Sequence, residues 1–287
     1  MSCQFSVIVP ARNSEATLEA CLRSILAQSV RDFELIAVDN NSNDRTKEVV
    51  ENLVAEDSRV RYLFEPKIGR GAARNAGVRV ARGAIILMTD SDCVVSPNWL
   101  VELTQPIIEA GEKIVMGFEE PLADNFWSRQ TQLADQEFLD RHTDGRYARC
   151  LDTKNIAFGR SVFVSASFDP TLENFEDFDF YLQIRSLFKI RLLSEIRVTH
   201  RHPDSFFRVL KINFNRAFWT ARIYDKHKNS LTSDKVIAMT RFLARKIEVG
   251  DFVSFLWQTK GEEMGTIFFR LIVAFAWSVG LLRGKFS

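Results

Sequence analysis

Four short apolar runs near the N-terminus alternate with stretches whose apolar residues recur at helical spacing. The runs cover residues 5–9, 33–38, 60–64 and 84–89. Runs of this length without polar alternation are typical of strands buried on both faces. Between them we predict helices, the first capped by Ser14, the second by Asp44 and the third starting near Ala72. This alternation with short connections predicts an α/β fold with a doubly wound, mostly parallel sheet flanked by helices.

The pattern is looser after residue 92. We predict helices over residues 97–110 and 178–187, and strands over residues 113–118 and 190–198. Residues 124–149 are polar and favour no element. A long helical pattern begins at Pro203, and one stripe of it is apolar. That stripe contains Phe207, Leu210, Phe214, Phe218 and Ala221.

The segment 264–282 is almost wholly apolar but contains Arg270. A membrane span requires about 20 apolar residues, so this segment is marginal. An arginine at the bilayer midplane also costs about 2.5–3.5 kcal/mol on insertion scales. Three interpretations stay open: an interfacial or re-entrant helix, a helix that packs in a core or an oligomer, and a membrane-spanning helix.

The charge is unevenly distributed although the formal net charge is only +1. Residues 200–287 contain 15 Lys and Arg against 7 Asp and Glu, and the preceding residues contain 23 against 30. An acidic first part followed by a basic tail indicates that the tail contacts a membrane surface or a polyanion.

The remaining composition narrows the class of protein. With 46% hydrophobic and 26% charged residues the chain is typical of a globular protein. The four cysteines form no Cys-x-x-Cys pair, which argues against a zinc site. Nothing in their spacing demands a disulfide, and the N-terminus enters a strand without a signal-like segment. We therefore expect a cytoplasmic protein.

Acidic residues follow two of the predicted strands and recur once later in the chain. Asp39 ends the second apolar run, and Asp90 and Asp92 follow the fourth. Because ligands bind at the carboxyl edge of open α/β sheets, these carboxylates are expected at one cleft. An Asp-x-Asp pair there suits a divalent cation that carries phosphates. The later pair, Glu176 and Asp177, is a candidate source of a catalytic base.

Five sequence motifs occur in an order that resembles a known enzyme family. They are SVIVPARN at 6–13, VDNNSND at 38–44, GRGAARNAG at 69–77, TDSD at 89–92 and ED at 176–177. On these motifs the chain resembles family 2 glycosyltransferases of the GT-A fold, over residues 5–202. The resemblance implies an inverting transferase that moves one sugar from a nucleotide-sugar to an acceptor hydroxyl.

The resemblance also implies which residues bind the nucleotide. Asp39 would contact the uracil or the ribose, and Arg74 would lie near the nucleotide. The first strand and its loop would hold the base through Pro10, Arg12, Asn13 and Glu15. For Asp39 a turn or cap is the alternative, and for Arg74 it is an exposed helical position. Asn40 stands where the family usually has a second Asp, which weakens any inference about the base.

The glycines at 69 and 71 do not indicate a dinucleotide fold. A Gly-x-Gly-x-x-Gly fingerprint would require glycine at position 74, but this chain has Arg74 there.

The metal and the base are likewise implied by the resemblance. Asp92 would bind Mn²⁺ or Mg²⁺ directly, Asp90 would reach the ribose or metal-bound water, and His200 would be a further ligand. The alternatives are an acidic loop cap and a hydrogen-bonded strand-end histidine. Asp177 would be the base, with Glu176 in reserve. An acidic helix start is the alternative for this pair.

The organisation and partners follow from these points. We expect a catalytic domain over residues 1–202 and a basic, aromatic-rich helical region over residues 203–287. The acceptor side would include Asn155 and Arg160. On the family pattern we expect a UDP-linked nucleotide-sugar donor, and a sugar or lipid-linked acceptor of a cell-envelope polysaccharide. The C-terminal region would hold the enzyme at the cytoplasmic face of the membrane, without nucleic acid as a partner.

Two other functions are weighed against this one. A nucleotidyltransferase would carry a glycine-rich phosphate loop after the first strand, and residues 10–13 contain no glycine. A non-catalytic nucleotide-sugar-binding subunit would not need Asp92 and Asp177, which are both present.

Overall fold

The computed structural model describes residues 3–227 and 264–286. Contacts divide the chain into two compact units. The first comprises Met1–Leu122 and Phe138–Arg201, and the second Ala123–Glu137 and His202–Ser287. Of the helical region expected over residues 203–287, residues 228–263 lie outside the described part of the chain.

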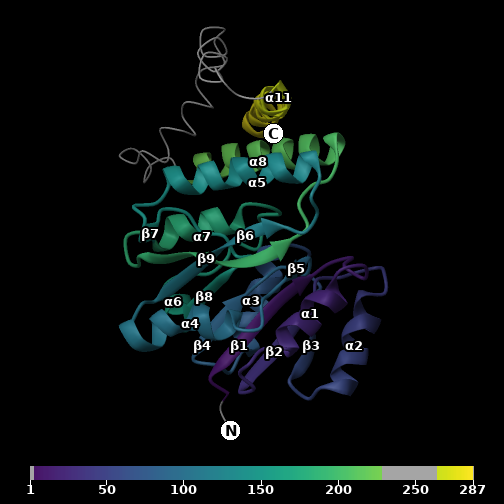
Figure 1. Cartoon of the computed structure of the whole chain (residues 1–287), viewed down its shortest axis with the longest axis vertical. Helices are drawn as coiled ribbons and strands as arrows, with labels where there is room; N and C mark the ends of the chain where they lie inside the picture. Colours follow the sequence, from purple (N-terminus) through teal and green to yellow (C-terminus); the bar gives the residue numbers. More distant parts are fainter. Residues whose placement is uncertain (1–2, 228–263, 287) are drawn as a thin grey trace. The chain divides into compact units, whose positions relative to one another are not determined.

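The first unit is built on one sheet with the strand order β3-β2-β1-β4-β8-β6-β9-β5, and β7 pairs with β9. The strands are β1 (Phe5–Ala11), β2 (Phe33–Asp39), β3 (Val60–Phe64), β4 (Ile85–Met88), β5 (Cys93–Val94), β6 (Ile114–Pro121), β7 (Tyr147–Ala148), β8 (Ile156–Gly159) and β9 (Ile190–His200). The four predicted N-terminal strands are confirmed, and all their mutual pairings are parallel. β8 lies antiparallel between β4 and β6, so the sheet is mixed (Figure 1).

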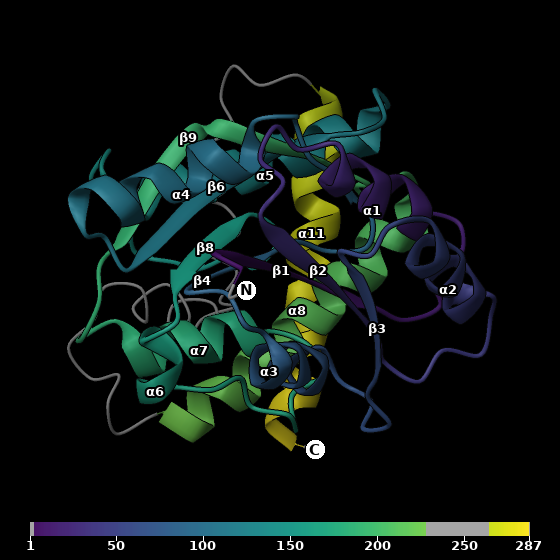
Figure 2. The ribbon, with the colours of Figure 1, turned by 90° about the horizontal axis from the view of Figure 1, so that it is seen from below.

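Helices cover both faces of this sheet. They are α1 (Leu18–Leu26), α2 (Thr46–Glu56), α3 (Arg70–Val80), α4 (Trp99–Ala110), α6 (Val162–Ser165) and α7 (Glu176–Ile184). Residues of α1, α2 and α4 share one core with Val7 and Leu35, whereas Gly77 of α3 meets Ile8 on the opposite face. A Cβ at position 77 would lie 2.5 Å from the Ile8 side chain, so only glycine permits this approach. Figure 2 shows α1 and α2 on one side of the strands and α3 on the other.

Two local expectations differ from the structure. The helix predicted from Ser14 begins at Leu18, and the Ser14 hydroxyl lies 2.9 Å from that of Ser91 instead of capping the helix. The unassigned stretch 124–149 contains the helix α5 (Phe126–Arg141). Its apolar periodicity is weak because it is rich in Gln, Arg and Asp, and propensity alone did not identify it.

The second unit contains the long helix α8 (Phe206–His227) and α11 (Met264–Phe286). The two helices pack so closely at Gly280 that a Cβ there would lie 2.3 Å from the Phe214 carbonyl oxygen. The Trp277 indole also donates to Asn213 Oδ1 at 3.1 Å. Of the interpretations open for residues 264–282, packing on a neighbouring helix is therefore observed. In the described part of the chain, no helix combines the length and apolar character that a membrane crossing requires. The side chain of Arg270 lies outside the described part.

Candidate active site

The Asp-x-Asp motif forms the connection between β4 and β5, at the carboxyl end of β4. β4 is completely buried, and the chain leaves it through the buried Thr89. Asp90 and Asp92 are partly exposed. The polar loop therefore begins where the apolar strand ends, as the sequence predicts.

Arg74 connects this loop to the acidic pair. It lies on α3 with only 1% of its surface exposed. Its guanidinium donates to Asp90 Oδ1 at 2.7 Å and also forms a short ion pair with Glu176 at the start of α7. The alternative of an exposed helical arginine is thus wrong. Two motifs more than eighty residues apart meet around one buried cation.

Asp177 lies in the first turn of α7, beside Glu176. The preceding Phe175 has φ = 61°, in the left-handed region, and turns the chain into the helix. Burial, together with the neighbouring charges of Glu176 and Asp152, raises the pKa of Asp177 to about 7, against the opposing effect of Arg74. A carboxylate with a pKa near neutrality is suited to accept a proton at physiological pH.

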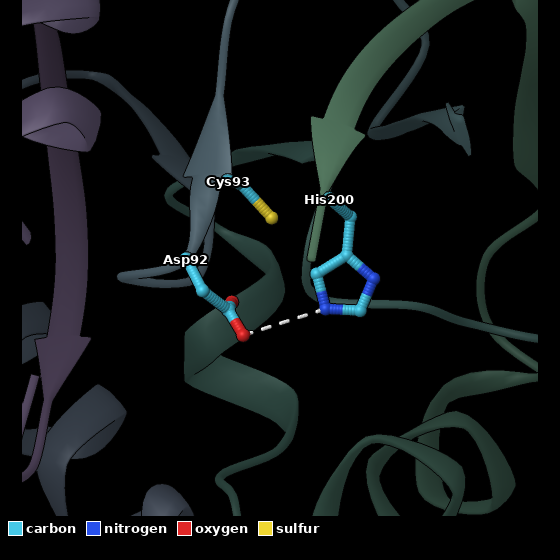
Figure 3. A group of neighbouring side chains, drawn as sticks. All are labelled: Asp92, Cys93 and His200. Atoms are coloured by element: carbon cyan, nitrogen blue, oxygen red, sulfur yellow. Dashed lines mark ion pairs between the residues drawn. The ribbon is translucent and has the colours of Figure 1, made fainter. Parts of the chain in front are cut away.

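His200 ends β9 opposite Cys93 of β5, which brings its ring to Asp92 (Figure 3). Its Nε2 lies 3.6 Å from Asp92 Oδ2, and its Nδ1 lies 2.6 Å from Glu119 Oε2. Burial alone would lower the pKa of His200, but the contacts with the carboxylates of Asp92 and Glu119 outweigh burial and raise it to about 9. Burial alone would raise the pKa of Asp92, but the contact with His200 outweighs burial and lowers it.

Asp92, Cys93 and His200 form a group with metal-ligand geometry, because their ligand atoms lie within 4.8 Å of one another. Burial raises the pKa of the Cys93 thiol well above its usual value, so the thiolate that a metal requires is disfavoured. The usable donors are a carboxylate oxygen and an imidazole nitrogen, and with the pKa of His200 at about 9 a metal would have to displace the proton from that nitrogen. A carboxylate oxygen beside an imidazole nitrogen is a donor pair that can hold a divalent cation. Asp90 is not in this group and instead accepts from Arg74.

The end of β2 carries the candidate nucleotide contacts. Asp39 is buried and accepts hydrogen bonds from the Tyr62 hydroxyl at 2.9 Å and the Ser42 N–H at 3.0 Å. The turn expected as an alternative for Asp39 is therefore present. Its contact with a nucleotide stays a prediction.

Asn40 explains the departure from the family's second Asp. Its amide donates to the carbonyl oxygens of Glu65 and Lys67 at 3.2 and 2.7 Å, and its Oδ1 accepts from the Gly69 N–H at 2.8 Å. A carboxylate could not donate to the two carbonyls. The asparagine thus holds the loop that leads into α3.

The remaining predicted base-binding residues lie on β1 and the loop after it. Pro10 lies in β1 and pairs in register with Val38, and Arg12 is exposed. The Asn13 Oδ1 accepts from the Asn43 N–H at 2.9 Å, and Glu15 pairs with Arg45 at 3.1 Å. These contacts tie the loop after β1 to the loop after β2, and the contacts with a base stay predictions.

Two residues expected on the acceptor side have contacts with the scaffold, and their role toward an acceptor stays a prediction. The buried Asn155 accepts from the Trp99 indole at 2.8 Å and donates to the carbonyls of Phe118 and Ile196. Arg160 donates to the carbonyls of Ala81 and Gly83. Both residues therefore hold strands and turns together.

The site also contains residues that the sequence did not single out, Glu119 and Lys154. Each is one charge within or beside an apolar stretch, and its position in the sequence carries no motif. Only the pairing of β6 with β9 brings Glu119 to His200. For Glu119 the sequence signal is its position directly after the apolar residues 114–118.

Comparisons with known proteins find a matching family and similar folds. The model of the family "Glycosyl transferase family 2" matches residues 6–165, more than half of the chain. The chain is 37% identical over 118 residues to Glycosyltransferase GlyG of Streptococcus pneumoniae serotype 4, which is 41% of this chain and 39% of that protein. The chain thus spans well under two thirds of that relative's length.

Two solved structures have a similar fold. The mannosyltransferase PcManGT from Pyrobaculum calidifontis, in complex with GDP-Man and Mn²⁺, has a TM-score of 0.70 at 14% identity and covers 98% of this chain and 86% of its own. S. aureus TarS 1-349 in complex with UDP-GlcNAc has a TM-score of 0.59 at 15% identity, covering 97% and 90%. At these identities the likeness shows the fold alone.

Proposed function

The chain belongs to glycosyl transferase family 2, and we propose that it transfers one sugar from a nucleotide-sugar to an acceptor hydroxyl with inversion. The observation that carries this proposal is the bridge from Arg74 to Asp90 and to Glu176. It joins the Asp-x-Asp loop to the acidic pair, so that donor and base groups can act on one substrate. A nucleotidyltransferase is disfavoured by the family match.

In the proposed reaction Asp177 removes the proton of the acceptor hydroxyl as its oxygen attacks the anomeric carbon. Arg74 holds Glu176 and Asp90 in place below the donor site. Asp92 and His200 would hold a divalent cation, and we propose Mn²⁺. When bound, the cation would offset the charge of the diphosphate leaving group. Asp39 and the loop after β1 would hold the nucleoside, and Asp90 would face the ribose.

We propose a UDP-sugar as the first donor to test. The two similar structures contain a UDP-sugar and a GDP-sugar, so the fold itself admits either base. In this chain Asp39 would contact the base or the ribose, whereas Asn40 is committed to the loop.

The decisive test of this proposal is binding of UDP with and without metal. We expect tight binding with Mn²⁺, and binding weakened in EDTA. Asp92→Asn should reduce the Mn²⁺-dependent binding by about 1–3 kcal/mol, the scale of a lost charged contact. Isothermal titration of UDP measures this, with Asp32→Asn, at an exposed position, as the matched control. Equal UDP affinity in EDTA and Mn²⁺ would contradict the proposal.

We also propose that the second unit binds an anionic membrane surface, which would bring the enzyme to a lipid-linked acceptor at the cytoplasmic face. Phe207 of α8 and Phe275 of α11 are 77% and 64% exposed. They border an apolar hollow of about 390 Å³, which also has Lys211 in its lining. Exposed aromatic residues beside basic ones are typical of interfacial helices.

Vesicle binding tests this second proposal. The full-length protein should co-sediment with anionic vesicles at low salt and be partly released at high salt, because salt screens only the charge contribution. Phe207→Ser with Phe275→Ser should weaken binding at least about tenfold, since each apolar side chain that leaves water contributes about 1.5–3 kcal/mol. Val164→Ser, an exposed apolar position in the first unit, is the control. A folded wild type that fails to bind at low salt would reject the membrane contact.

A further inference from the structure

Glu119 is a buried carboxylate beside the candidate metal donors. Only 3% of its surface is exposed. Burying a charge is costly unless partners compensate it. Its partners include Lys154 and His200, one at each carboxylate oxygen.

The sheet register directs Glu119 to His200. β6 and β9 are parallel, and Pro121 lies opposite His200 with Glu119 opposite Val198. Side chains two residues apart in a strand share a face, so Glu119 and His200 project to the same side of the sheet. An irregularity between Met116 and Phe118 shifts this register. The alternation of side chains along β6 before the irregularity therefore does not predict the contact between Glu119 and His200.

Lys154 compensates the charge of Glu119 from the other side. Its Nζ lies 3.2 Å from Glu119 Oε1 and 2.8 Å from Asp152 Oδ2, and its side chain is 15% exposed. One cation thus lies between a carboxylate next to His200 and a carboxylate whose charge acts on Asp177. The arrangement links the surroundings of the metal donors to those of the base.

The contact at Nδ1 determines which ring atom of His200 is offered to the donor site. Nδ1 is the ring nitrogen that faces this carboxylate, because it lies 2.6 Å from Glu119 Oε2 in an ion pair. Nε2 is then the atom directed at Asp92, 3.6 Å away. A carboxylate behind a ligating histidine fixes the tautomer and the ring orientation and makes the imidazole a better ligand.

We propose that Glu119, with Lys154 as its counter-ion, is a positioning residue that holds His200 with Nε2 toward the metal–diphosphate group of the donor. This inference rests on the proposed function, because it assumes that the donor carries a divalent cation to Asp92 and His200. Glu119 acts through His200 and does not touch the substrate.

Mn²⁺ affinity in the presence of UDP, followed by the electron paramagnetic resonance of free Mn²⁺, tests the inference without relying on turnover. Glu119→Gln should weaken Mn²⁺ binding about 10- to 100-fold, the usual effect of losing such a supporting carboxylate. His200→Ala should weaken it by at least as much. In the His200→Ala background, Glu119→Gln should change the affinity by less than about twofold, because its effect passes through the missing ring.

The control is Glu120→Gln, which removes an exposed carboxylate from the adjacent position of the same strand. It should alter Mn²⁺ affinity by less than about twofold. Thermal unfolding of each metal-free variant checks its fold. If Glu119→Gln alone does not fold, the charge-neutral pair Glu119→Gln/Lys154→Met replaces it, with the same losses expected.

Each outcome separates this inference from the proposed function. Wild type that binds no Mn²⁺ with UDP would overturn both. Wild-type binding together with an unchanged Glu119→Gln affinity would overturn the positioning role alone. Equal losses from Glu119→Gln in the wild-type and His200→Ala backgrounds would also overturn it, since the carboxylate would then act independently of His200.

Discussion

Asp177→Asn is expected to reduce turnover by about 10²–10⁴-fold, the usual contribution of a general base. Asparagine has nearly the same shape and cannot accept the acceptor's proton, so binding of the UDP-sugar donor should stay close to normal. The expected result is therefore a loss in kcat with donor affinity intact. Initial rates with the natural acceptor, together with titration of the donor, measure the two quantities separately.

The pH dependence provides an independent check of the same residue. The pKa of Asp177 is raised to about 7, and only the ionised carboxylate can act as a base. The rate should thus rise with pH through about 7 to a plateau, and below that value it should fall about tenfold per pH unit. Asp177→Asn should lose this limb of the profile.

Glu173→Gln is the matched control, because it removes an exposed carboxylate just before α7. It should leave both rate and pH profile unchanged. Near-normal kcat in Asp177→Asn would place the base elsewhere, and Glu176→Gln would be the next variant to measure.

Arg74→Met is expected to lower the free energy of unfolding by about 3–5 kcal/mol, the cost of leaving a buried charge without its partner. Methionine fills much of the same volume but leaves Glu176, which is only 2% exposed, next to an apolar side chain. Asp90 loses the same cation. Urea denaturation of the wild type and the variant measures the difference.

Two further variants separate the buried charge from the loss of the arginine itself. Arg74→Met/Glu176→Gln removes both charges of the pair and should recover a large part of the lost stability. Arg79→Met, on the same helix but largely exposed beside Glu65, should cost no more than about 1 kcal/mol. A loss below 1 kcal/mol in Arg74→Met would show that Arg74 does not stabilise the meeting of the two motifs.

Local apolar patterning predicted the framework of the first unit correctly. The four N-terminal strands and the three helices between them lie where the apolar runs and spacings indicate, except that the first helix begins at Leu18. These elements are determined by burial of their own residues, so their signal is contained in short windows. Local signals failed to predict a helix cap where the capping side chain forms a hydrogen bond with a distant residue. Ser14 contacts Ser91 instead of capping a helix.

The direction and neighbours of the later strands depend on contacts between distant residues. β8 reads as an ordinary apolar run, but it enters the sheet antiparallel between β4 and β6. The neighbours and direction of a strand are decided by the whole sheet, and the residues of one strand do not contain this information. The same holds for α11, whose apolar sequence suited three environments and whose observed packing depends on Gly280 against α8.

By itself the sequence determined the candidate chemistry: acidic residues directly after buried strands, and five motifs in a family's order. Only the tertiary structure decided how those residues are held. It buried Arg74 between Asp90 and Glu176, committed Asn40 to a loop, and brought Glu119 to His200 across two strands. The physical reason is that a charge in water needs no partner, whereas a charge buried by folding requires one. That partner comes from whichever distant segment the fold places beside it.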